Sequence, residues 1–300
     1  MKKITYNHFG GTEVLQMTDA PLPAGEIIVK VKAVSINPLD WKIWQGDMKL
    51  MSGRTFPKSV GIDFSGVVEQ GDGKYRKGDE VFGMAHVFKG GALAEYVAVK
   101  AGDIARKPGA MAFEEAASLP VAGSAALQIF DKLVKITPGM QVLINGAGGG
   151  IGPLAIQLAK KAGAIVTSVV GPAAIDMAAR LGSDVVVNYQ QENVLATGST
   201  FDAIIDLSGK MTYRTARTIL NKKGTYVNTS PGPREIIGSL FSGGRYKVLL
   251  LKPSAANLEK LAASGLQTFV SKRYDFRDYR KAYDEMKKGG VPGKAVITVN

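Results

Sequence analysis

The hydrophobic residues in the first third of the chain fall into short runs separated by turns. Segment 27–34 reads Ile-Ile-Val-Lys-Val-Lys-Ala-Val, with lysines between β-branched residues, and this alternation is typical of a half-buried strand. Further strands are predicted at 64–69, 80–83 and 94–99, joined by turns rich in glycine and aspartate. This spacing predicts a small β-rich domain that is partly barrel-like.

From residue 113 onward, buried strands alternate with helices. Strands alternating with helices pair in parallel through right-handed crossovers, and six of them match a doubly wound Rossmann sheet. The fold class is therefore α/β. The predicted helices are 113–117, 122–134, 153–162 and 173–181, and the predicted strands are 141–145, 164–170, 185–188, 203–207, 225–229 and 246–251.

The end of the chain returns to the first domain. Helices are predicted from residue 258 and at 276–288, and the segment 294–299, Lys-Ala-Val-Ile-Thr-Val, is strand-like. We expect this strand to complete the β-rich domain, which makes that domain discontinuous. The predicted division is 1–117 with 255–300 for the β-rich domain, and 118–254 for the Rossmann domain.

Composition excludes several kinds of site. The chain has no cysteine, so neither a disulfide nor a thiolate-ligated zinc site can form. A zinc site would need both histidines, His8 and His86, together with carboxylates, and structural or surface roles are the simpler expectation for these residues. No apolar run reaches the ~18 residues of a membrane span, and no secretory signal is recognised at the start, so we expect a cytoplasmic protein.

The net charge of +12 can indicate nucleic acid, an anionic membrane surface or a phosphorylated ligand. The basic residues form only short clusters, such as Lys222-Lys223 and Lys287-Lys288, and no nucleic-acid-binding motif is present. A solvated surface is the default interpretation, with a modest attraction for a phosphorylated cofactor.

A glycine run between a strand and a helix is the clearest functional motif. Residues 146–152 read Gly-Ala-Gly-Gly-Gly-Ile-Gly, between the strand 141–145 and the helix 153–162. Small residues let the backbone approach a pyrophosphate, whose charge meets the N–H groups and the positive end of the helix. Gly152 allows close packing of helix on strand. A tight turn without a ligand is the alternative, and the surrounding β–α repeats argue against it.

The end of the second strand bears on the choice of cofactor. An acidic residue there normally holds the ribose 2′-hydroxyl of NAD, but this strand ends Ser168-Val169-Val170-Gly171-Pro172. The missing carboxylate favours NADP(H). No lysine or arginine stands at this turn to bind the 2′-phosphate, so the preference is moderate.

Several segments taken together resemble the zinc-independent quinone oxidoreductases of the medium-chain dehydrogenase/reductase superfamily, over nearly the whole chain. Segment 35–42, Ser-Ile-Asn-Pro-Leu-Asp-Trp-Lys, is most similar to the branch of alkenal/enone and quinone reductases. The resemblance implies that the β-rich domain is a GroES-like catalytic domain. The other segments that carry it are 6–15, 61–68, 77–83, 91–97, 116–123, 146–160 and 293–297.

The same resemblance implies a site without metal. Zinc-dependent relatives have a cysteine ligand at or near the position of Asn37, and a Gly-His-Glu motif where this chain has Gly61-Ile62-Asp63. Both ligands are therefore absent, as are the four cysteines of the structural zinc lobe.

The resemblance also places the cofactor-binding residues. Asn37 is expected near the nicotinamide, together with Thr229 and Ser230. Tyr189 matches a tyrosine that contacts the 2′-phosphate, although a strand-end aromatic residue that caps the sheet is an equal alternative. The full expected set is Asn37, Ala147, Gly149, Gly150, Ile151, Gly152, Ser168, Tyr189, Leu207, Ser208, Thr229, Ser230 and Lys294.

The implied reaction is hydride transfer from NADPH to a quinone or to the β-carbon of an α,β-unsaturated carbonyl. This chemistry needs orientation and a hydrogen-bond donor at the developing oxyanion. Asn37 is the first candidate for that donor and Lys42 the second, although a solvated cation is the more common role of such a lysine. Trp41 and Trp44 are expected either to line a substrate pocket or to belong to the core. Asp40 and Asp63 are expected to hold turns.

A binding role is the alternative to catalysis. Some relatives bind RNA or membrane surfaces while retaining the cofactor site, and the positive charge keeps such a role, with little turnover, open. The family also implies a homodimer, formed through the sheet edge at 246–251.

Overall fold

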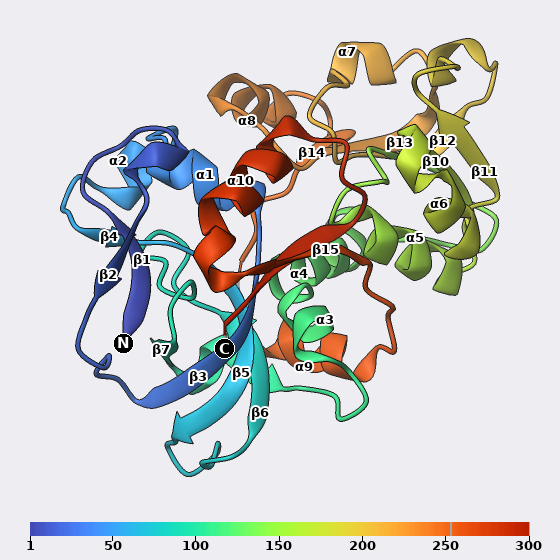
Figure 1. Cartoon of the computed structure of the whole chain (residues 1–300). Coiled ribbons are helices and arrows are strands. Elements are labelled where there is room, and N and C mark those ends of the chain that lie inside the picture. The colour runs from blue at the N-terminus through green and yellow to red at the C-terminus, as the bar shows by residue number, and fades with distance from the viewer. Residues whose placement is uncertain (253, 300) are drawn as a thin grey trace. The chain divides into compact units, whose positions relative to one another are not determined.

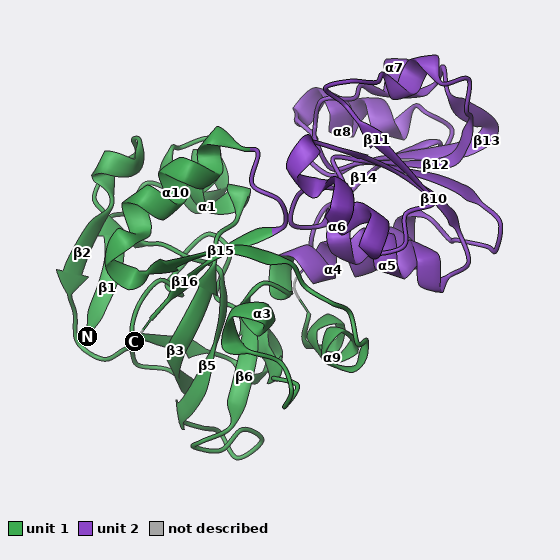
Figure 2. Ribbon diagram, turned by 45° about the vertical axis from the view of Figure 1, so that its right-hand side comes forward, with its two compact units in different colours: residues 1–121, 253–289, 294–300 green, residues 122–252, 290–293 purple. Residues whose placement is uncertain are grey.

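The computed structural model describes residues 1–252 and 254–299, which form two compact units. Unit 1 comprises Met1–Val121, Pro253–Gly289 and Lys294–Asn300, and unit 2 comprises Ala122–Lys252 and Gly290–Gly293. Figure 2 shows them in green and purple. The sequence placed the boundaries at 117/118 and 254/255, a few residues from the divisions found here.

Unit 1 is built on antiparallel strands with one parallel pair. Its larger sheet has the order β15-β16-β3-β5-β6-β8, and β7 also pairs with β3; a smaller sheet has the order β2-β1-β4. The strands and helices of unit 1 are β1 (Lys2–Tyr6), β2 (Gln16–Asp19), β3 (Ile27–Ser35), α1 (Pro38–Trp44), α2 (Lys49–Ser52), β4 (Lys58–Ser59), β5 (Asp63–Gln70), β6 (Glu80–Met84), β7 (Tyr96–Val99), β8 (Ile104–Arg106), α3 (Phe113–Ala117), α9 (Ala255–Ala263), β15 (Val270–Asp275), α10 (Tyr279–Lys288) and β16 (Lys294–Thr298).

The predicted alternation of β3 is confirmed, because Ile27, Val29 and Val31 are buried while Lys30 is exposed. The closing strand β16 pairs antiparallel with β3, with Val296 opposite Ser35. Unit 1 is therefore built from discontinuous parts of the chain, as the sequence predicts for the β-rich domain. The sequence pattern missed β15, which pairs in parallel with β16; this edge strand is mostly exposed and carries the polar residues Lys272 and Arg273, so it has no hydrophobic signal.

Unit 2 contains the six-stranded parallel sheet that the sequence predicted, with the order β11-β10-β9-β12-β13-β14 (Figure 1). The last predicted strand, 246–251, is real but shorter. The strands and helices of unit 2 are α4 (Pro120–Gln128), β9 (Gln141–Asn145), α5 (Gly152–Lys161), β10 (Ile165–Val170), α6 (Ile175–Arg180), β11 (Val185–Asn188), β12 (Phe201–Asp206), α7 (Tyr213–Ala216), β13 (Leu220–Asn228), α8 (Pro233–Leu240) and β14 (Tyr246–Val248).

The strand order of unit 2 determines where a ligand can bind. The chain runs from β9 outward to β10 and β11, and then returns to β12 on the other side of β9. Ligands of such sheets bind beyond the carboxyl ends of the strands where the order reverses. The switch point lies between β9 and β12, which end at Asn145 and Asp206.

Candidate active site

The glycine run follows β9 directly, and the structure explains its small residues. Gly146 has a φ of +83°, and a Cβ there would lie 2.8 Å from the Ser208 backbone nitrogen. A Cβ on Gly152 would lie only 1.9 Å from the carbonyl oxygen of Ala147. The backbone is therefore packed too closely for any side chain at these two positions.

The helix α5 begins at Gly152, and no side chain caps its N-terminus. Its first turn therefore presents backbone N–H groups and the positive end of the helix dipole to an anion. Gly150 and Ile151 lead into this turn. Ala147 and Gly149 differ, because their N–H groups already donate to Val169 O at 3.0 Å and to Gly146 O at 3.2 Å. Ala147 and Gly149 can therefore assist the binding of an anion by their small size and not by their N–H groups.

A buried aspartate connects the strand ends at the switch point. Asp206 is fully buried, and its Oδ1 accepts hydrogen bonds from Asn145 Nδ2 at 2.9 Å and from Ser208 Oγ at 2.6 Å. Its Oδ2 accepts from the backbone N–H of Met211 at 3.2 Å and from the Tyr226 hydroxyl at 3.4 Å. One carboxylate thus fixes both ends of the loop 207–211 to β9 and β13.

Three predicted cofactor residues lie around this carboxylate. The Leu207 N–H donates to Asn145 O at 2.8 Å, and the Thr229 hydroxyl donates to Asp206 O at 2.9 Å. Ser230 follows β13, where its N–H donates to Asn228 Oδ1 at 2.8 Å. Together with Ser208, these residues occupy the carboxyl ends of β12 and β13, as the sequence predicted.

Ser168 does not fit its expected role. It is fully buried within β10, and its hydroxyl lies 2.6 Å from the hydroxyl of Ser183. The structure therefore gives Ser168 a structural contact and no open face for a cofactor.

Tyr189 is 59% exposed and lies beside the end of β10. A Cβ built on Gly171 would lie 3.2 Å from the Tyr189 hydroxyl oxygen, so this hydroxyl stands at the turn after the second strand. Tyr189 also lines a cavity of about 420 Å³ within unit 2. The cavity is lined by Asn145, Val169, Tyr189, Gln190, Gln191, Glu192, Asn193, Val194, Leu195, Lys210, Met211 and Thr215.

In unit 1, Asn37 is the N-cap of α1 and belongs to a buried polar cluster. Its Nδ2 donates to Asp63 Oδ2 at 3.0 Å and to Ser35 O at 3.3 Å, and its Oδ1 accepts from Lys294 Nζ at 2.7 Å. Both amide hydrogens are therefore already used within unit 1. Asn37 could donate to a substrate only by breaking one of these bonds, which argues against its predicted role as the oxyanion donor.

Lys294 is buried, and its ammonium donates to Ile36 O at 2.8 Å as well as to Asn37. This ammonium neutralises part of the charge of the two nearby carboxylates, Asp40 and Asp63. Within unit 1 the Lys294 ammonium thus has structural contacts, and its contact with a cofactor stays a prediction.

Asp40 holds the turn at the start of α1, as predicted, whereas Asp63 binds the start of α4, a contact between elements that the prediction of a turn did not include. Asp40 accepts from the Asn37 N–H at 2.9 Å, and Asp63 from the Val121 N–H at 3.1 Å. Burial raises the pKa of Asp40 to about 7 and the pKa of Asp63 to about 6. Burial also lowers the pKa of Lys294 against the opposing attraction of both carboxylates. The cluster therefore binds protons more readily near neutral pH than free aspartates do.

The remaining predicted residues lie on α1. Trp44 is buried, with its ring 4.6 Å from that of Tyr283 in an edge-on arrangement, and Trp41 packs at the margin of the same core. These are the contacts of core side chains, one of the two alternatives for the tryptophans. Lys42 is exposed and has no hydrogen bond or ion pair among residues 1–252 and 254–299, which fits a solvated cation.

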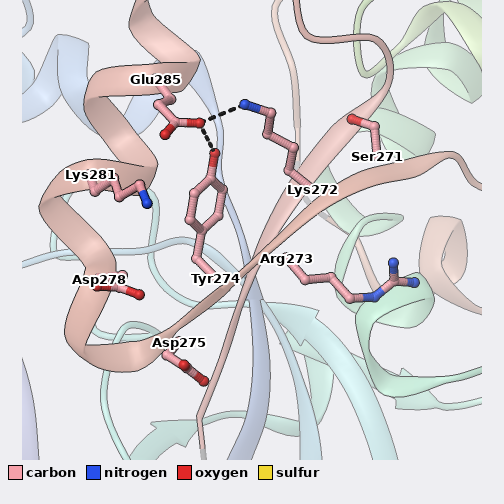
Figure 3. Close-up of a pocket in the computed structure, with 8 residues that line it drawn as sticks. All are labelled: Ser271, Lys272, Arg273, Tyr274, Asp275, Asp278, Lys281 and Glu285. Carbon is pink, nitrogen blue, oxygen red and sulfur yellow. Dashed lines mark hydrogen bonds and ion pairs between the residues drawn. The ribbon is translucent and has the colours of Figure 1, made fainter.

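A second cavity, of about 440 Å³, lies in unit 1 between β15 and α10 (Figure 3). Figure 3 shows Glu285 bound to both Lys272 and Tyr274, at 2.5 and 2.6 Å. This cavity contains none of the predicted site residues. Three basic and three acidic residues line it, so it has no net charge to attract an anionic cofactor.

Known proteins that are similar to this chain in sequence and fold include several oxidoreductases. Residues 23–109 match the alcohol dehydrogenase GroES-like domain, and residues 181–297 match a family described as zinc-binding dehydrogenase. The chain is 32% identical to the mitochondrial NAD(P)H oxidoreductase RTN4IP1 of Bos taurus, over 97% of this chain and 87% of that protein. The chain belongs to the quinone oxidoreductase family of medium-chain dehydrogenases/reductases.

Other similar proteins match this chain over nearly its whole length. The chloroplast envelope quinone oxidoreductase homolog of Arabidopsis thaliana is 30% identical, over 99% of this chain and 98% of that protein. The trans-enoyl reductase pgmF of Aspergillus terreus is 29% identical, over 94% and 90%. The solved quinone oxidoreductase of Coxiella burnetii has a TM-score of 0.91 and 30% identity, covering 100% of this chain and 99% of that one. The predicted family and fold are thus confirmed.

The sequence did not identify three residues of unit 2: Asn145 and Asp206, which connect the strand ends, and Lys210, which lines the cavity with Tyr189. The available signal for Asp206 was an acidic residue that follows the apolar run Ala-Ile-Ile at the carboxyl end of the strand. Lys210 gave no signal, because nothing in a linear pattern shows that the loop after β12 lines the same cavity as Tyr189.

Proposed function

We propose that this member of the family is an NADPH-dependent oxidoreductase that works without metal. The proposed acceptor is a quinone or the β-carbon of an α,β-unsaturated carbonyl. The observation that carries the proposal is the uncapped α5 N-terminus behind a glycine run, at the switch point of the sheet. The glycine run fits a dinucleotide for two reasons. Gly146 and Gly152 keep the turn tight, since a Cβ at either position would meet backbone atoms. Beside Gly149 there is open space, because the nearest atom to a Cβ there is 3.7 Å away.

The preference for NADPH rests on the end of β10. This strand ends Val169-Val170-Gly171 without a carboxylate, so nothing at that turn repels a 2′-phosphate or binds a free 2′-hydroxyl. The Tyr189 hydroxyl stands at this turn and can donate a hydrogen bond. The name of the bovine relative, NAD(P)H oxidoreductase, supports a nicotinamide cofactor of either kind.

The proposal of a metal-free reaction rests on the residues at the positions of the zinc ligands. Asn37 is occupied by Asp63, Ser35 and Lys294, and Ile62 is a buried apolar residue. A cation beside the Lys294 ammonium would be repelled by it. An amide and an isoleucine are not ligands that zinc prefers.

The cofactor, when bound, supplies a hydride from its nicotinamide ring. The chain's own residues supply geometry: the first turn of α5 binds the pyrophosphate, and Asp206 fixes Ser208 and Thr229 at the ends of the central strands. Because a reduced quinone or enolate can take a proton from water, a dedicated acid is not required.

The test is the oxidation of NADPH and of NADH, followed by the loss of nicotinamide absorbance, with a panel of quinones and α,β-unsaturated ketones and aldehydes. We expect turnover with members of at least one class and a lower KM for NADPH. Binding of NADPH without turnover of any acceptor would refute the proposed reaction. Salt-dependent retention on RNA or on anionic vesicles would then favour the alternative binding role.

We also propose that the protein is a cytoplasmic homodimer formed along β14. This strand is at the end of the sheet in unit 2, and beside it Ile237, Leu240 and Phe241 on or next to α8 are 59, 77 and 84% exposed. An unpaired strand edge next to exposed apolar residues fits a second copy related by twofold symmetry. Sedimentation of the protein and of Phe241→Ser tests this, and a monomeric wild-type protein at micromolar concentration would refute it.

A further inference from the structure

The structure contains a cation that can replace the one missing after the second strand. NADPH differs from NADH by a 2′-phosphate, which carries about −1.5 to −2 charges at neutral pH if it titrates like other phosphate monoesters. Neither Gly171 nor its neighbours Pro172, Ala173 and Ala174 can neutralise this charge. The binding site therefore needs a cation from another part of the fold.

Lys210 lines the 420 Å³ cavity together with Tyr189. The two residues come from different strand ends, Tyr189 from the end of β11 and Lys210 from the loop after β12. Glu192 is the other charged residue of the lining, and its carboxylate would weaken the binding of a phosphate. Lys210 is thus the one lining residue whose charge favours an anion.

The backbone on both sides of Lys210 is fixed, while its side chain is free to bind. The Lys210 N–H donates to Ser208 Oγ at 3.1 Å, and the Met211 N–H donates to Asp206 Oδ2 at 3.2 Å. The side chain is exposed, and its ammonium has no hydrogen bond or ion pair among the described residues. An anchored backbone reduces the entropy lost when this lysine binds a ligand.

We propose that Lys210 is the specificity-determining residue for NADPH, and that its ammonium pairs with the 2′-phosphate while the Tyr189 hydroxyl donates to the same group. This inference rests on the proposed function, since it concerns which cofactor the same site takes. It also explains how the chain can select NADPH without a basic residue after β10.

The experiment measures the binding of two adenosine nucleotides by calorimetry, so that no acceptor needs to be known. Adenosine 2′,5′-bisphosphate carries the 2′-phosphate, and 5′-AMP lacks it. The variants are Lys210→Met, Lys210→Arg and Tyr189→Phe. Lys222→Met is the control, because Lys222 is also an exposed lysine, lies near the start of β13 and is outside the cavity lining.

We expect the wild-type protein to bind the bisphosphate about tenfold more tightly than 5′-AMP, the gain of a charge-assisted contact in a partly exposed site. Lys210→Met should remove most of this difference and change 5′-AMP binding by less than about twofold. Lys210→Arg should retain the difference, Tyr189→Phe should reduce it less than Lys210→Met, and Lys222→Met should leave it unchanged.

The outcomes separate this inference from the proposed function. If the wild-type protein binds the bisphosphate more tightly and Lys210→Met discriminates as well as Lys222→Met, the role of Lys210 is refuted and the proposed NADPH dependence stands. If the wild-type protein binds both nucleotides equally, or neither, then the NADPH preference fails and the role of Lys210 fails with it.

Discussion

The replacement of Asp206 by asparagine should weaken cofactor binding, although the carboxylate itself is an anion and fully buried. Its Oδ1 accepts three hydrogen bonds, from the Asn145 amide and from the N–H and hydroxyl of Ser208, and its Oδ2 accepts from Met211 and Tyr226. An asparagine has one acceptor, so its NH₂ group must face one of these sets of donors. At least one hydrogen bond is lost and the loop 207–211 is released from one end.

Asp206→Asn should lower the free energy of unfolding by about 2–3 kcal/mol. One or two hydrogen bonds to a charged acceptor are lost, and the new NH₂ group faces a donor of the protein. The dissociation constant of NADPH should rise about tenfold, because the loop must then be ordered on binding. Urea unfolding gives the first quantity, and the change in NADPH fluorescence on binding gives the second. Ser208→Ala is a milder variant, since it removes one donor to Asp206 and leaves the carboxylate.

Asp202→Asn is the matched control. Asp202 lies on the same strand at its other end, where it accepts from the Gln141 N–H at 3.0 Å and from Asn221 Nδ2 at 2.7 Å. This variant should lose about 1 kcal/mol of stability and bind NADPH with the wild-type affinity. A folded Asp206→Asn protein with unchanged NADPH affinity, or an equal loss of affinity in Asp202→Asn, would show that Asp206 does not order the loop 207–211 for cofactor binding.

Three further predictions concern the glycine run, the buried carboxylates and the metal. Gly152→Ala should lower both stability and NADPH affinity, because its Cβ would lie 1.9 Å from Ala147 O. Gly149→Ala should lower affinity alone, because its Cβ would lie 3.7 Å from the nearest atom. Equal melting temperatures for the two variants would contradict this prediction. Burial raises the pKa of Asp40 to about 7, so the folded protein keeps a proton that the unfolded chain loses near pH 4, and this stabilisation is lost as the pH rises through 7. Asp40→Asn should therefore reduce the fall in the free energy of unfolding between pH 5 and pH 8 by on the order of 2 kcal/mol, and an unchanged fall in urea titrations would contradict it. Dialysis against a chelator should leave NADPH oxidation unchanged, and activity restored only by added zinc would refute the metal-free site.

The fold could be predicted because its strongest elements are buried and regular. The strands β9, β10 and β12 are mostly apolar and buried. The glycine run marks the junction between β9 and α5. The elements that the sequence missed lack such a pattern. The strand β15 is exposed and polar, and α1 is a short helix whose start depends on the capping contacts of Asn37 and Asp40.

The sequence identifies candidate site residues best where backbone geometry fixes the residue type. It is less informative where the role of a residue depends on its side-chain contacts. Gly152 and Gly146 follow from steric limits that any glycine-rich turn shares. By contrast, Asn37, Ser168 and Lys294 were placed at a cofactor from the resemblance, and their hydrogen bonds lie within the fold. Lys210 and Asp206 depend on which loops the sheet order brings together, and this order is a tertiary property that the linear pattern does not contain.

We propose that this protein would position a bound NADPH for direct hydride transfer to a quinone or enone without a metal. The most direct measurement is a single turnover of the chelator-treated protein with NADPH deuterated at C4, in its two stereoisomers, and the best acceptor of the panel. We expect one NADP⁺ formed for each acceptor reduced, with a slower reaction for one of the two stereoisomers. No oxidation of NADPH by either class of acceptor, or oxidation that requires added metal, would contradict it.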